Sequence, residues 1–215
     1  MNRFKLVYDF TLEEILLCFA IISLSYALAE AIFRGFDTFS QIIGNGEFDR
    51  ILVRPRHPIL QVLGSTIELT RIGRIIQSIL IFIYIMPTIS IVWTVSKVLT
   101  LVLMILCGTT LFASLFVLGA AISFFTLEGL EVLNILTDGG REFGQYPLAI
   151  YGEYVLKFFT YIVPIALVQY YPLLYLTNRS DNKWLSIVPL LANLFIIPVA
   201  FLWKQGMKHY QSTGS

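Results

Sequence analysis

The side chains that carry out most enzyme chemistry are few in this sequence, and they do not gather at catalytic spacings. The chain holds no GxxxxGK(S/T) phosphate-binding loop, no HExxH zinc motif and no GxSxG nucleophile motif. Its histidines, His57 and His209, stand alone, and Cys18 and Cys107 lie far apart inside apolar stretches. The sequence therefore predicts no catalytic residue, no metal site, no bound cofactor and no ATPase activity of its own.

The richest group of polar residues lies between positions 34 and 74. Apolar side chains recur there at helical spacing, the stretch 44–46 (Gly-Asn-Gly) interrupts the pattern, and Pro55 and Pro58 end it. This spacing predicts short amphipathic helices on the membrane surface, with their charged side chains facing the cytoplasm. The residues expected at this surface are Gly46, Glu47, Phe48, Asp49, Arg50, Ile51, Leu52, Arg54 and Pro55.

Two kinds of partner suit this stretch. Arginines alone would suit a loop that grips anionic membrane lipids. Here the acids Asp37, Glu47 and Asp49 alternate with the bases, and such a mixture is what a docking surface for another protein requires. We therefore expect a protein partner, with membrane lipids beside it.

Two acid–arginine pairs are predicted at the membrane boundary. Glu30 precedes Arg34 by one helical turn, and Glu68 lies one turn before Arg71, close to Arg74. Because a charge is costly in hydrocarbon, each pair is expected to neutralise itself near the membrane surface. No chain of buried acids runs along the apolar segments, which argues against a proton pump.

The elements that position these residues are long apolar segments. The 215-residue chain is 57% hydrophobic and 13% charged, with a mean hydropathy of +0.77. A membrane-spanning helix needs about 20 mostly apolar residues. Five segments meet this requirement, namely 15–33, 75–93, 98–125, 158–176 and 185–203. The sequence thus predicts an all-α integral membrane protein, a polytopic helical bundle in one domain over residues 1–215. The formal net charge of +1 gives no reason to expect nucleic acid as a partner.

The distribution of Lys and Arg predicts the orientation, because cytoplasmic segments retain these residues. With the N-terminus outside, the cytoplasmic side holds Arg34, Arg50, Arg54, Arg56, Arg71, Arg74, Arg141, Lys157, Lys204 and Lys208. The outer side then holds Arg3, Lys5, Lys97, Arg179 and Lys183. The opposite orientation would place the most basic loop outside. We therefore expect region 34–74 and the C-terminus in the cytoplasm, and the outer N-terminus suggests a further span before Met1.

A connecting helix at the bilayer edge is predicted within residues 126–147. Its apolar face holds Leu127, Leu130 and Leu133, and its polar face holds Glu128, Glu131 and Asn134. The stretch 138–140 (Asp-Gly-Gly) is expected to end this helix.

Several short motifs carry a family resemblance. They are GEFDRILVRP at 46–55, YPLAIY at 146–151, PIA at 164–166, YP at 171–172 and the tail GMKHYQSTG at 206–214. Together they resemble the permease subunits of the type-2 ABC exporter superfamily, most of all the branch known only as an uncharacterised transport-system permease. The similarity extends over essentially the whole chain, and the stretch 46–55 is its most specific part.

This resemblance implies six spans per subunit, a cytoplasmic coupling helix between the second and third, and a dimer of permeases on two separate ATPase subunits. ATP and Mg²⁺ would bind to those ATPases. Since five spans are visible here, the chain is expected to begin where the second span of the family would. The resemblance implies a bacterial or archaeal plasma membrane and an export permease without its own ATPase.

Two other classes stay open. A membrane-embedded enzyme should show polar residues clustered at one bilayer depth, and a non-transporting scaffold should not couple to ATP hydrolysis. The apolar, aromatic spans lean towards a hydrophobic or amphipathic cargo.

Overall fold

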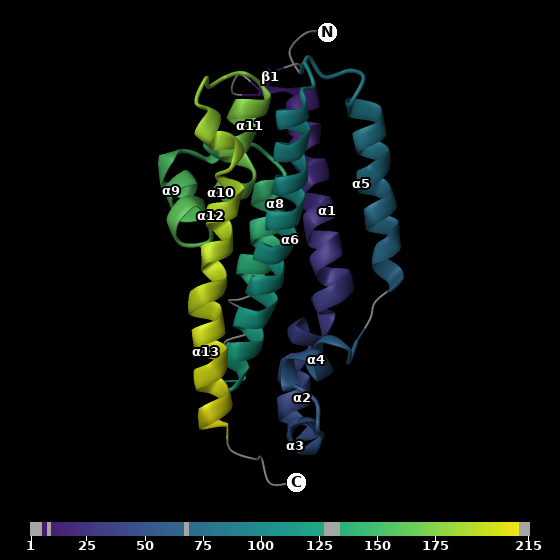
Figure 1. The fold of residues 1–215 in the computed structure, drawn as a ribbon, viewed down its shortest axis with the longest axis vertical. Helices are drawn as coiled ribbons and strands as arrows, with labels where there is room; N and C mark the ends of the chain where they lie inside the picture. Colours follow the sequence, from purple (N-terminus) through teal and green to yellow (C-terminus); the bar gives the residue numbers. More distant parts are fainter. Residues whose placement is uncertain (1–5, 8–9, 67–68, 127–133, 211–215) are drawn as a thin grey trace.

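Two long helices, α1 (Leu12–Asp37) and α6 (Val95–Ser123), form the centre of an elongated bundle in the computed structural model (Figure 1). The structure describes residues 6–7, 10–66, 69–126 and 134–210. A capping box starts α1: the Thr11 hydroxyl accepts from the Glu14 backbone N–H at 3.3 Å, and the Glu14 carboxylate accepts from the Thr11 N–H at 2.8 Å. Two N–H groups at the start of the helix are thereby satisfied.

Shorter elements surround this pair. The flanking helices are α5 (Ile72–Ile85), α9 (Glu153–Tyr161) and α13 (Ile196–His209). The remaining elements are β1 (Leu6–Val7), β2 (Phe10–Thr11), α2 (Phe39–Gly44), α3 (Glu47–Val53), α4 (Pro58–Leu63), η1 (Leu69–Arg71), η2 (Ile135–Gly139), α8 (Gly140–Gly144), η3 (Leu148–Tyr151), α10 (Ile165–Val168), α11 (Tyr170–Leu176), η4 (Lys183–Ser186), α12 (Pro189–Ala192) and η5 (Asn193–Phe195). The strands β1 and β2 pair antiparallel, with Leu6 opposite Thr11.

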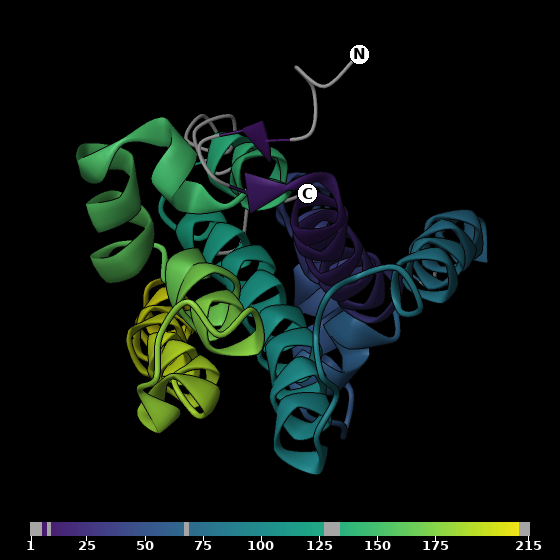
Figure 2. The ribbon, with the colours of Figure 1, turned by 90° about the horizontal axis from the view of Figure 1, so that it is seen from above.

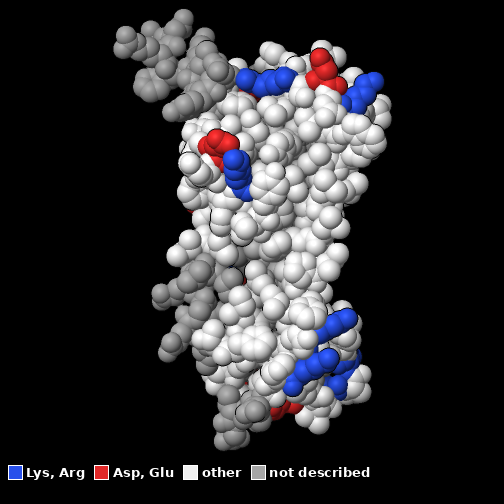
Figure 3. Space-filling view, turned by 90° about the vertical axis from the view of Figure 1, so that its left-hand side faces the viewer, with Lys and Arg blue, Asp and Glu red and all other residues white. Residues whose placement is uncertain are grey.

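The strand β1 and the last residues of α13 lie at opposite ends of the bundle (Figure 1). The helices α2, α3 and α4 gather beside the end of α13, and we call residues 39–63 the end cap. From above, α5 lies on one side of α1, whereas α9 and α13 lie beyond α6 (Figure 2). Lys, Arg, Asp and Glu gather mainly at the two ends of the flank in Figure 3, and its middle is mostly uncharged. This distribution suits a bundle that lies across a membrane.

Close approach of α1 and α6 depends on a glycine. A Cβ atom at Gly108 of α6 would lie 2.6 Å from the Ser25 hydroxyl of α1. That hydroxyl donates to the Ile105 carbonyl at 3.2 Å. The next residue of α1 is Tyr26, and its ring packs edge-on against Phe112, one helical turn after Gly108, at a centroid distance of 5.2 Å. Small side chains are the usual means by which membrane helices approach each other.

Charged groups fasten the N-terminal end of the bundle. Arg179, in the hairpin after α11, pairs with Glu14 of α1 at 2.9 Å. The buried Lys97 ammonium donates to the Leu176 carbonyl at 2.8 Å and to the Asn178 side chain at 2.7 Å. The buried ammonium is therefore hydrogen-bonded.

Three of the described helices are long and apolar enough to cross a membrane: Leu12–Gly44, Val95–Ser123 and Pro189–His209. A fourth results if Glu153–Tyr161 and Ile165–Leu176, bent by 87° to each other, count as one span. The protein is therefore an all-α membrane protein, while its five-span count remains a prediction.

Two of the predicted segments differ from continuous helices. The segment 158–176 bends between α9 and α10, where Pro164 lies. The segment 75–93 is helical only as far as Ile85, the second residue before Pro87. A hydropathy scale scores side chains only, so it does not register that proline lacks a backbone N–H donor. A helix usually ends before a proline, even where the apolar sequence continues.

The connecting helix predicted within residues 126–147 does not end where the sequence predicts. Its leucine and acidic repeat, 127–133, lies outside the described residues. The stretch 138–140 does not end the helix, because the π-helix η2 continues directly into α8. A Cβ atom at Gly140 would lie 2.8 Å from the Ile165 side chain. This glycine therefore permits packing against α10.

Candidate functional site

The end cap is a compact unit of three short helices. Gly46 adopts the left-handed conformation, with φ of 69°, and lets the chain turn from α2 into α3. The Gln61 amide of α4 donates to the Ile51 carbonyl at 2.9 Å and to the Arg56 carbonyl at 2.8 Å. These bonds tie α4 to α3 and to the turn between them.

One face of α3 is buried against the bundle. The Phe48 ring is fully buried, and it packs edge-on against Phe124 after α6 and Tyr210 after α13, with centroids at 5.3 and 5.0 Å. The Tyr210 hydroxyl donates to the Asp49 carboxylate at 3.1 Å, and burial together with this carboxylate raises the pKa of Tyr210. Ile51 is also buried. Three residues expected at an outer surface thus face this chain's own helices, because residues distant in the sequence cover them.

Other side chains of the end cap are exposed. The residues of the expected set that lie there are Glu47, Arg50, Leu52, Arg54 and Pro55, joined by Val53 and Arg56. Leu52 is 48% exposed and Val53 is 83% exposed. A groove of about 510 Å³ runs between α3 and α4, with Arg50, Arg54 and Glu47 among its lining side chains. This face offers two apolar side chains surrounded by charges, which is the composition of a docking surface.

A buried carboxylate joins the two ends of the segment that carries the cap. Glu30 of α1 is only 3% exposed, and its oxygens lie 2.7 Å from Arg74 of α5, 2.9 Å from Arg71 and 3.5 Å from Arg34. Arg34 also pairs with Asp37. Glu68 lies outside the described residues. The structure therefore gathers three arginines at one carboxylate, where the sequence indicated two local pairs.

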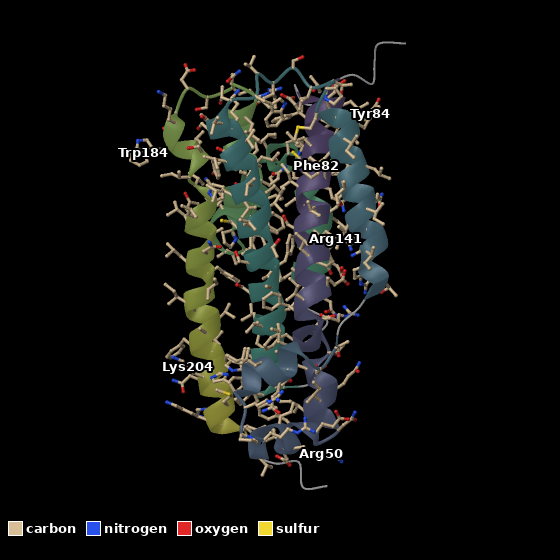
Figure 4. The ribbon with its side chains drawn as sticks, turned by 45° about the vertical axis from the view of Figure 1, so that its right-hand side comes forward. Arg50, Phe82, Tyr84, Arg141, Trp184 and Lys204 are labelled. Carbon is tan, nitrogen blue, oxygen red and sulfur yellow. The ribbon has the colours of Figure 1, made fainter. Side chains whose placement is uncertain are left out.

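A second polar cluster lies far from either end. The Tyr26 hydroxyl of α1 donates to Asp138 of η2 at 2.9 Å, and the Arg141 guanidinium of α8 lies 4.9 Å from the centroid of the Tyr26 ring. Arg141 also pairs with Asp138 at 3.7 Å and with Glu142. Figure 4 places Arg141 about midway between the labelled residues at the two ends of the bundle. Arg141 therefore lies along the middle part of the bundle and not at one of its ends.

The sequence interpretation missed this cluster, although a signal was present. Asp138, Arg141 and Glu142 are spaced to share one helical side, and Gly140 and Gly144 allow that helix to pack deeply. Among the described residues, no group of three or more His, Cys, Asp or Glu is placed to hold a metal ion.

A family model described as "ABC-2 family transporter protein" matches residues 1–214. The chain belongs to the ABC-2 transporter family. No match was found among curated proteins or among solved structures. The resemblance seen in the sequence motifs is confirmed, and ABC-2 membership makes the chain a membrane-embedded permease subunit of a transporter.

ABC-2 permeases are generally non-enzymatic membrane subunits that work with an ATPase.

Proposed function

We propose that this chain is the membrane subunit of an ATP-driven exporter, and that its end cap docks on a separate ATPase that binds ATP and Mg²⁺. In this proposal the cap lies in the cytoplasm of a bacterium or archaeon, the bundle crosses the plasma membrane, and membrane lipids surround it. The exposed face with Leu52, Val53 and Arg54 would contact the ATPase. ABC-2 membership and the mixed charges of that face support this assignment.

The observation that supports the proposal most is the attachment of the end cap to the helices of the bundle. Phe48 attaches α3 to the ends of α6 and α13, and Glu30 attaches the return of the chain, Arg71 and Arg74, to α1. A push on the cap would therefore be transmitted to α1, α5, α6 and α13 together. Closure of the ATPase dimer on ATP would supply this push and change the side to which the path opens.

A second permease is part of the proposal. The carboxylates of Asp138 and Glu142 are each 58% exposed, although Arg141 between them lies midway along the bundle. A charge that faces hydrocarbon at mid-depth costs about 2.5 to 3.5 kcal/mol or more. We infer that this face borders another permease, identical or homologous, with a water-accessible path between the two.

The Tyr26 cluster also meets one expectation of the enzyme alternative, since its polar groups share one depth. The hydroxyl of this cluster belongs to Tyr26, which donates a hydrogen bond to Asp138. Because a neighbouring carboxylate can act as a general base for a hydroxyl, the choice of transport over an enzyme rests on ABC-2 membership.

The test is co-purification of the ATPase with the permease carrying Glu47→Lys. If the cap docks on the ATPase, the reversed charge weakens the binding free energy by up to about 2 to 5 kcal/mol, the cost for a buried interfacial charge. ATP hydrolysis in the complex should then fall as well. If the cap binds only anionic lipid, the added lysine strengthens attachment by about 1 kcal/mol. Lys183→Glu, at the other end of the bundle, is the matched control. Unchanged co-purification with Glu47→Lys would contradict docking through this face.

A further inference from the structure

An aromatic pocket of about 360 Å³ lies between η2, α8 and α9. The rings of Phe143, Tyr154, Phe158 and Phe159 form much of its wall. Phe143 and Phe159 lie 5.5 Å apart between centroids, and Phe158 meets Phe159 edge-on at 5.1 Å. The volume falls within the range of small-molecule sites, about 300 to 1,000 Å³. Rings at several orientations offer both faces and edges to a ligand.

The helix that forms one wall of the pocket carries exposed carboxylates. Glu142 is adjacent to Phe143 and one turn beyond the pocket residue Gly139, and Asp138 immediately precedes Gly139. Both acids are 58% exposed, whereas the Arg141 side chain is 19% exposed and lies against the Tyr26 ring. The charge that this helix presents outward is therefore mainly negative.

Aromatic faces and carboxylates favour the same class of ligand. The negative face of an aromatic ring attracts a cation, most of all an organic cation that gives up little hydration. A carboxylate beside the rings adds to this attraction, and it would repel an anion. A neutral apolar molecule would gain nothing from the acids.

We propose that this pocket binds a hydrophobic organic cation, which is the class of substrate that the permease exports. The rings would hold the apolar body and the charge, and Glu142 would pair with the charge from the rim. This assignment rests on the proposed function, because it makes the pocket a substrate-binding site on the transport path.

A glycine in the pocket wall supplies the sharpest test. A Cβ atom at Gly139 would have one close neighbour, the Ile135 side chain at 3.8 Å, which is ordinary contact. A larger side chain at Gly139 therefore extends into the pocket without meeting the backbone, and Gly139→Leu should fill it. The next glycine differs, since a Cβ atom at Gly140 would lie 2.8 Å from Ile165.

The experiment measures equilibrium binding to the full-length permease in phosphatidylcholine nanodiscs, with empty nanodiscs subtracted. The probes are tetraphenylphosphonium and tetraphenylborate, which share size and shape but carry opposite charges. We expect saturable binding of the cation and weaker binding of the anion. Glu142→Gln should weaken cation binding about fivefold, and Gly139→Leu should abolish it.

Two control variants accompany these. Asp181→Asn removes an exposed acid in the hairpin after α11, and Gly73→Leu adds a side chain to a helical glycine that has no atom within 4 Å of its Cβ position. Both should bind the cation as the wild type does. Equal binding of the two probes, or undiminished cation binding by folded Gly139→Leu, would overturn the proposal. If Gly139→Leu does not fold, Glu142→Gln and the probe pair decide.

No ATPase and no ATP are present in this measurement. Loss of docking through the end cap would therefore leave probe binding intact. If the cation does not bind while the permease still couples normally to its ATPase, only the pocket assignment is contradicted.

Discussion

Arg74 of α5 donates to the Glu30 carboxylate of α1 at 2.7 Å, across 44 positions of the sequence. This contact closes the segment that carries the end cap into a loop with both ends fixed to the bundle. Arg71 reaches the other oxygen of the same carboxylate at 2.9 Å. Movement of the cap would therefore displace α1 and α5 together.

Removal of the Glu30 charge should destabilise the protein. Glu30→Gln leaves three guanidiniums without their shared carboxylate, and loss of a hydrogen bond to a charged group costs about 1.5 to 3 kcal/mol. For a chain of this size, 1 kcal/mol lowers the melting temperature by about 2 to 4 °C. Thermal unfolding in detergent measures the shift. The control is Glu153→Gln, which breaks an exposed pair with Lys157 and should change little. Equal shifts for both variants would contradict a structural role for the Glu30 cluster.

Phe48 and Leu52 are one turn apart on α3, but their truncation should have different effects because Phe48 is fully buried and Leu52 is 48% exposed. Phe48→Ala empties a fully buried site and should cost about 3 to 5 kcal/mol of stability. Leu52→Ala removes a half-exposed side chain and should change stability by less than about 0.5 kcal/mol. Only Leu52→Ala should lower ATPase co-purification at unchanged stability. A stable Phe48→Ala protein would argue against the structural role of Phe48, and full ATPase binding by Leu52→Ala would argue against docking through Leu52.

The short helices of the end cap were predictable, because Gly46 and the two prolines mark their limits within a local pattern. The burial of Phe48 was not. Periodicity identifies the apolar face of α3, but Phe124 and Tyr210, which cover it, come from distant parts of the chain. For the same reason the charge pattern found Glu30 with Arg34 but not with Arg74.

The depth of Arg141 was hidden for a different reason. A hydropathy window treats a charged stretch as a surface loop, whereas here the Arg141 side chain lies against the Tyr26 ring and pairs with Asp138 and Glu142. In the sequence alone, the glycines that permit this packing resemble glycines that end a helix.

Orientation can be tested with single cysteines in a background that lacks Cys18 and Cys107. Asn45→Cys lies in the end cap and Asn182→Cys in the hairpin at the other end of the bundle. An impermeant thiol reagent added to intact cells should label Asn182→Cys only, and permeabilised cells should label both. The reverse pattern in intact cells would place the end cap outside and remove it from any ATPase.

The number of permeases follows from the exposed acids at mid-depth. After the mass of the ATPase and of the nanodisc is subtracted, the mass of the purified complex should correspond to two permeases. Each has a mass of 24.5 kDa if the two are identical. An active complex with one permease would contradict the inference that Asp138 and Glu142 border a second one.

The central claim, that ATP binding by the partner moves the end cap, is tested most directly by a distance measurement. Spin labels at Asn45→Cys in the two permeases of the complex report the separation of the two caps by pulsed electron paramagnetic resonance. The account predicts that this separation changes between the ADP state and an ATP state held by a hydrolysis-deficient ATPase, and that Glu47→Lys removes the change. Identical distances in the two nucleotide states, with the ATPase bound, would contradict the account.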